Sequence, residues 1–131
     1  MTRFVVDASA VIFLASQAVE VAPAHQLLAP TLLRSQTLSA LHEAVQRGEI
    51  PSHVARDRVI RIGQMPIRLL GDAVLRRRAW DLADQLGWAS TYNAEYVALT
   101  QLQGDALVTM DAELARSVEG LIKTASIDAL Y

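Results

Sequence analysis

Two short apolar segments, each leading through an aspartate into a helical pattern, constrain the fold of this chain most. RFVV (3–6) is rich in β-branched residues, ends at Asp7 and is followed by the helical pattern ASAVIFLAS. ALVT (106–109) is followed in the same way by Asp111. A buried strand that runs into a helix is the repeating unit of an α/β protein. Such units predict a parallel sheet that is covered by helices on both faces.

The rest of the chain continues this alternation. Apolar spacing predicts a helix over 27–50 that stops at Gly48, helices at 51–65 and 72–87, one that ends at Gly104, a short one at 111–120, and a closing strand at 122–127. A length of 131 residues is enough for one hydrophobic core and too short for two. The sequence therefore predicts a single α/β domain over residues 1–131.

The composition excludes several classes of protein and of site. With 52% hydrophobic and 20% charged residues, the chain has a soluble globular composition and no signature of disorder. It contains no cysteine, which excludes disulfides and thiolate metal sites. No apolar run is long enough to cross a membrane, and MTRFVVD enters a strand without a charged leader. We therefore expect no signal peptide and a cytoplasmic location.

The net charge of −2 conceals an uneven distribution. Residues 34–78 contain nine arginines and four acids, a local charge of +5, which leaves −7 for the rest of the chain. This basic segment suits a binding face for phosphate or for an acidic partner, and it suits solvated arginine-rich helices equally well. For the triple arginine at 76–78 the solvated face is favoured, with contact to phosphate as the alternative.

Asp7 and Asp111 lie at or just past the ends of two predicted parallel strands, where such sheets bind their ligands. Either residue alone could be only a helix N-cap, which is worth roughly 1 kcal/mol. Two of them at equivalent strand ends would both point into one crevice. Adjacent carboxylates repel unless a proton or a cation separates them. The hard divalent ions Mg²⁺ and Mn²⁺ suit an all-oxygen cluster of this kind.

Four segments resemble the PIN-domain nucleases, in particular the VapC-like toxins of type II toxin–antitoxin pairs. They are FVVDASAVI, LLAPTLLRSQTLSAL, YNAEYVALTQLQGDALVTMDAEL and IKTASI, and together they run over essentially the whole chain in the family's order. The resemblance implies a three-layer α/β/α sandwich with a central parallel sheet, usually assembled as a homodimer. It also implies an Mg²⁺- or Mn²⁺-dependent endoribonuclease that acts on RNA and is blocked by a cognate antitoxin.

Members of this family carry four acidic residues, and only two of them are present here. Position by position, the first acid is Asp7 and the last is Asp111, whereas the other two positions hold Gln36 and Asn93. The resemblance makes all four catalytic residues, with Asp7, Asp111 and Asn93 as metal ligands. Because amides ligate Mg²⁺ only weakly, we expect low metal affinity and weakened cleavage. The alternative is a catalytically inactive PIN-fold module that binds RNA or an antitoxin-like partner.

Two further observations bear on this site. Gln36 shares a helix face with Leu33 and Ala40, so its amide either meets a polar crevice or reaches solvent at the edge of an apolar stripe. Ser9 and Thr109 stand beside the two aspartates. Their hydroxyls could hold a metal-bound water, and local turn bonding is as good an interpretation.

No other acid is expected to replace the missing carboxylates. Glu95 follows Asn93 by two positions, so its side chain points roughly 160° away around the helix. Glu43 lies two turns beyond Gln36, on the order of 10 Å along the helix axis. We expect the amides to determine the chemistry of the site.

The remaining histidines and aromatic residues are assigned structural roles. The histidines have no ligand spacing and are expected at the surface: His25, His42 and His53. Four aromatic residues are expected to pack in the core or in a dimer interface rather than to stack on nucleobases: Trp80, Trp88, Tyr92 and Tyr96.

Overall fold

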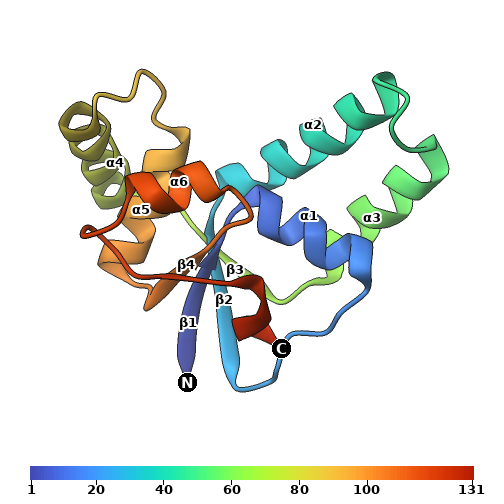
Figure 1. Cartoon of the computed structure of the whole chain (residues 1–131), viewed down its shortest axis with the longest axis horizontal. Helices are drawn as coiled ribbons and strands as arrows, with labels where there is room; N and C mark the ends of the chain where they lie inside the picture. Colours follow the sequence, from blue (N-terminus) through green and yellow to red (C-terminus); the bar gives the residue numbers. More distant parts are fainter.

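Five parallel strands form the central sheet of the computed structural model, which describes all residues from 1 to 131 (Figure 1). In spatial order they are β3 (Ile67–Leu70), β2 (His25–Pro30), β1 (Thr2–Val6), β4 (Ala106–Val108) and β5 (Thr124–Ala125). The chain moves outward from β1 to β3 and then returns to build β4 and β5 on the other side of β1. The carboxyl ends of β1 and β4 therefore meet at the switch point of the sheet, where doubly wound folds bind ligands.

Helices cover both faces of this sheet. They are α1 (Ala8–Gln17), α2 (Leu32–Gln46), α3 (Ser52–Gln64), α4 (Ala73–Leu86), α5 (Tyr92–Leu102) and α6 (Ala112–Ser117), followed by the 3₁₀ helix η1 (Ile127–Leu130). Helices α1, α2 and α3 pack on one another on one side, and α4 and α5 pack together on the other side (Figure 1). The predicted three-layer α/β/α sandwich is confirmed. None of the helices has the length and apolar character needed to span a bilayer.

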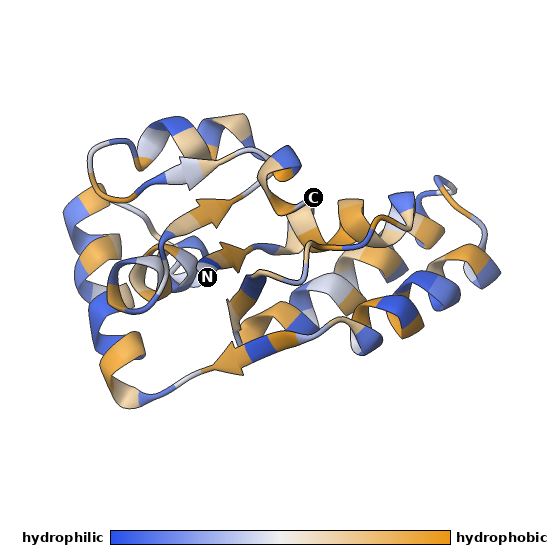
Figure 2. Cartoon of the chain, turned by 90° about the horizontal axis from the view of Figure 1, so that it is seen from below, coloured by the Kyte–Doolittle hydropathy of each residue, from blue (hydrophilic) through white to orange (hydrophobic).

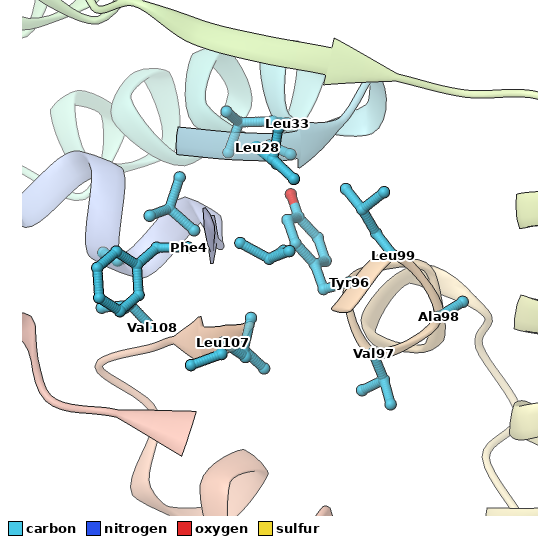
Figure 3. Close-up of a cluster of buried hydrophobic side chains, with 14 of the residues drawn as sticks. Phe4, Leu28, Leu33, Tyr96, Val97, Ala98, Leu99, Leu107 and Val108 are labelled. Carbon is cyan, nitrogen blue, oxygen red and sulfur yellow. The ribbon is translucent and has the colours of Figure 1, made fainter. Parts of the chain in front are cut away.

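The hydrophobic core lies on both faces of the sheet. The strands are mainly hydrophobic along their length, whereas the helices alternate hydrophobic and hydrophilic residues (Figure 2). Helix α5 is the most deeply buried helix, with residues 96–100 all inaccessible or nearly so. Tyr96 of this helix is 1% exposed, and its hydroxyl points toward Leu28 of β2 and Leu33 of α2 (Figure 3).

The prediction of one helix over 27–50 is wrong at its start. Residues 27–30 are the buried end of β2, which pairs with both β1 and β3, and the helix begins only at Leu32. A short apolar run cannot be assigned to strand or helix by periodicity alone, and the helical pattern that follows it concealed the boundary. Strand β3 was not predicted, because it is a four-residue edge strand with the exposed Arg68 in its middle.

Helix α1 ends at the only non-glycine residue with a positive φ angle, Ala18, at φ 53°. A Cβ is unfavourable in this left-handed conformation. Ala18 is exposed, and Arg61 tethers the helix end separately by donating from Nη1 to the Ala15 carbonyl at 2.6 Å. We expect Ala18→Gly to raise the free energy of unfolding by about 0.5–1 kcal/mol in urea denaturation.

The matched control for this substitution is Ala24→Gly. Ala24 is also exposed, and its φ angle is not positive. Glycine there only increases the freedom of the unfolded chain, so a small loss of stability is expected. Equal losses at both positions would contradict the idea that Ala18 is strained.

Candidate functional site

Asp7 follows β1 directly and is 7% exposed. Its Oδ1 atom accepts hydrogen bonds from the Ala10 amide at 3.0 Å and from the Ser9 hydroxyl at 2.7 Å. Its Oδ2 atom accepts one from the Thr109 hydroxyl. The N-cap interpretation of Asp7 is therefore confirmed, and the carboxylate is also fixed from the side of β4.

Asp111 caps α6, at the same edge of the sheet as Asp7. Its Oδ1 atom accepts from the backbone amides of Glu113 at 3.0 Å and Leu114 at 3.2 Å, while the residue itself is exposed. The Thr109 hydroxyl that donates to Asp7 also accepts from the Asp111 amide at 3.1 Å. The two aspartates are thus joined through one threonine, and Ser9 adds a second link by accepting from the Met110 amide at 2.9 Å. The hydroxyls of Ser9 and Thr109 thus each make one local bond, to Asp7 and to the Asp111 amide, and one bond across the two strand ends.

Gln36 is half-buried on α2 and is held by Tyr96 of α5. The Tyr96 hydroxyl donates to Gln36 Oε1 at 2.6 Å. Burial raises the pKa of Tyr96 far above its ordinary value, and the negative charges of Asp7 and then Glu95 add to this effect. The hydroxyl is therefore protonated at neutral pH and acts as a donor.

The side chains of Gln36 and Asn93 line one hollow of about 470 Å³. It is lined by Gln36, Gly87, Trp88, Ala89, Ser90, Tyr92 and Asn93. We call it the amide hollow. Asn93 is exposed in the first turn of α5, and its side chain has no hydrogen-bond partner within the chain. The amide hollow therefore lies between α2, the loop that follows α4, and the first turn of α5.

The carboxylates do not form a larger cluster. No group of three or more His, Cys, Asp or Glu side chains lies close enough together to hold a metal ion. Glu95 is half-buried, and burial raises its pKa, with Arg76 acting in the opposite direction. Glu43 is exposed and accepts a hydrogen bond from Ser39 at 2.9 Å. Neither glutamate lines the amide hollow.

Sequence reasoning missed the part that Tyr96 plays at this site. Its predicted place in the core is confirmed, because the side chain is 1% exposed. The hydroxyl, however, reaches the polar edge of the site. A signal was present in the sequence, because Tyr96 lies three positions after Asn93, on the adjoining face of the helix, and a buried tyrosine hydroxyl requires a partner.

The structure separates the roles assigned to the remaining aromatic residues and histidines. Trp80 and Tyr92 are 65% and 56% exposed, so of the two predicted places only a dimer interface is left for them, whereas Trp88 is half-buried against the core. His42 and His53 are exposed as expected. His25 is not a free surface residue, because its ring meets Phe4 edge to face at 5.0 Å and its Nδ1 atom is buried without a partner.

The comparisons with known proteins bear on the fold. No family model matches the sequence, and no curated protein matches it. Among solved structures, the crystal structure of PAE2754 from Pyrobaculum aerophilum is similar, with a TM-score of 0.76 and 23% sequence identity. The similarity covers 98% of this chain and 93% of that chain. It shows that the two proteins share the fold.

Proposed function

We propose that this chain is a VapC-like PIN-domain protein whose metal-dependent ribonuclease site has lost half of its catalytic charge. The hydrogen bond from Tyr96 to Gln36 is the observation that carries the proposal. It ties an amide of α2 to α5, the helix that also carries Asn93, and Asn93 lines the same hollow as Gln36. Asp7 is joined to Asp111 through Thr109. The four positions that the family resemblance implies thus form two linked pairs.

The side chains at these positions offer the ligand atoms that a hard divalent ion prefers, but they carry too little negative charge to bind it tightly. All of them offer oxygen, which Mg²⁺ and Mn²⁺ prefer, but they supply two negative charges where four carboxylates would supply four. Asp7, Asp111 and Asn93 would hold the ion, at millimolar concentrations, with water completing its shell. A bound ion would supply an activated water and would offset charge on the scissile phosphate.

The residues of the chain itself supply orientation. Ser9 and Thr109 fix both oxygens of Asp7, so this carboxylate needs no rearrangement when substrate arrives. Tyr96 fixes the oxygen end of Gln36. Groups that are already oriented act without a reorganisation cost in the reaction, which is how such sites stabilise developing charge.

The proposal is tested by RNA cleavage at high protein concentration with Mn²⁺. We expect slow cleavage that stops in excess EDTA and in the Asp7→Asn variant. Asp84→Asn removes the same charge from an exposed position on α4 and is expected to leave the rate unchanged. Cleavage that persists in EDTA would exclude the metal-dependent reaction.

The second candidate function is a non-catalytic module of the same fold that binds RNA or an antitoxin-like partner. Two observations favour it, namely the pair of amides and the absence of any three acidic or histidine side chains that could hold a metal. RNA binding without any cleavage in Mn²⁺ would support it. By the same resemblance, both candidates include a homodimer and a cognate antitoxin.

A further inference from the structure

We propose that the amide hollow binds one unpaired nucleobase, stacked on Tyr92 and held at its edge by Gln36 and Asn93. The inference rests on the proposed function only in taking single-stranded RNA as the polymer that carries the base. The site shares Asn93 with the proposed metal position, but it uses Gln36 and Asn93 as amides that bind a base.

The stacking face is provided by Tyr92. This residue opens α5 and is 56% exposed, although it borders a hollow. Its backbone amide donates to the Ser90 hydroxyl at 3.3 Å, which helps to fix the chain at this point. Trp88 lies in the same hollow and is half-buried. Exposed aromatic rings stack on unpaired bases without strong preference for sequence, because every base has a π face.

The two amides face the same space with complementary groups. Tyr96 donates to Gln36 Oε1, which leaves the NH₂ group of this amide, a donor, without a partner in the chain. Asn93 has no partner within the chain and offers both a donor and an acceptor. Base edges carry acceptors and donors side by side, and amides form paired hydrogen bonds with them.

The lining of the hollow selects for a neutral ligand. None of its seven residues is charged at neutral pH: Gln36, Gly87, Trp88, Ala89, Ser90, Tyr92 and Asn93. The hollow of about 470 Å³ falls within the size range of small-molecule sites, about 300–1,000 Å³. A planar neutral heterocycle fits these features, whereas a phosphate or a lone cation would find no counter-charge.

The test is a fluorescence titration with RNA in EDTA. Trp80→Phe leaves Trp88 as the only tryptophan, because the chain has two. We expect a short single-stranded RNA to change the emission of Trp88, and an abasic ribose-phosphate chain of equal length to bind more weakly. Tyr92→Ala in this background should raise Kd about 5- to 150-fold, the effect of losing one base stack. Tyr92→Phe should retain the affinity.

Tyr131→Ala is the matched control, because Tyr131 is a 47% exposed tyrosine that does not line the hollow. An unchanged Kd in Tyr92→Ala would overturn the proposal, as would equal binding of the abasic chain. A change of oligomeric state in Tyr92→Ala, seen by sedimentation, would show a protein contact instead and would also overturn it. If the free mononucleotide binds as tightly as RNA, the base site stands and its ligand is the nucleotide.

Restoring the acids at positions 36 and 93 separates this inference from the proposed function. Carboxylates offer only acceptors and add negative charge, so the double variant should bind the RNA more weakly in EDTA while it cleaves RNA faster in Mn²⁺. Failure of cleavage would count against the nuclease alone. Equal binding of the RNA and the abasic chain, with cleavage by the double variant retained, would count against the base site alone.

Discussion

Gln36→Glu combined with Asn93→Asp is expected to increase metal-dependent RNA cleavage by roughly a hundredfold or more, the scale of one oriented stabilising group in an active site. Both changes preserve the shape of the side chain and restore a charge. The Tyr96 hydroxyl that donates to Gln36 would donate equally to a carboxylate, and such charge-assisted bonds are stronger. At position 93 an acid lies in the first turn of α5, where the helix dipole favours it.

Cleavage of labelled RNA with Mn²⁺ measures this effect, with the two single variants alongside the double one. The added Asp7→Asn change in the restored chain should abolish the gain, whereas Asp84→Asn should not. Thermal unfolding gives an independent measurement, because Mg²⁺ should raise the Tm of the restored chain more than that of the unaltered one. Strong and equal cleavage by both chains would mean that Asp7 and Asp111 suffice. No cleavage by either would favour the binding module.

Gly104→Ala is expected to lower the free energy of unfolding by about 1–3 kcal/mol, the usual cost of forcing an extra carbon into a packed core. A Cβ at this position would lie 2.7 Å from Val5 Cγ2 and 3.2 Å from Thr100 Cα. Val5 is fully buried in β1 and Thr100 is 3% exposed, so neither can move away freely. Gly104 also follows the end of α5, where its amide donates to the carbonyls of Leu99 and Thr100.

Gly63→Ala is the matched substitution of opposite sign. Gly63 lies in the last turn of α3, and a Cβ there meets nothing within 4 Å. Alanine should raise the free energy of unfolding by about 0.5 kcal/mol, because it favours the helix more than glycine does. Urea denaturation of both variants compares the two. A loss at Gly104 no larger than the ordinary scatter of surface changes would show that β1 and α5 are less tightly packed than described.

The parts of the fold that could be predicted from sequence are those with a clear periodic pattern. RFVV and ALVT became β1 and β4, and the segments 51–65 and 72–87 became α3 and α4. Strands β2 and β3 were missed because pairing with neighbours, and not local pattern, makes them strands. Leu28 would suit a buried helix as well as a buried strand, and its pairing with β1 and β3 is what makes it part of a strand.

The candidate site could be predicted to a different extent. Asp7 and Asp111 could be predicted because α/β sheets bind ligands at the carboxyl ends of their strands. Gln36 and Asn93 were found only through resemblance to a family. The hydrogen bond between Tyr96 and Gln36 joins residues sixty positions apart, and no local pattern reports such a contact. The exposure of Tyr92 depends on how the loop after α4 folds, which the aromatic character of the residue could not indicate.

Tyr96 belongs to the hydrophobic cluster and also donates to the side chain of Gln36. Any change in how α5 rests on β1 and β2 therefore shifts a hydroxyl at the polar site, even when no polar residue is altered. Among related proteins, we therefore expect the core residues that pack around Tyr96 to vary together with the residue at position 36. Proteins with glutamate there should have different core residues from proteins with glutamine. The residue at position 36 would then be recognisable from the interior of the protein as well as from its surface.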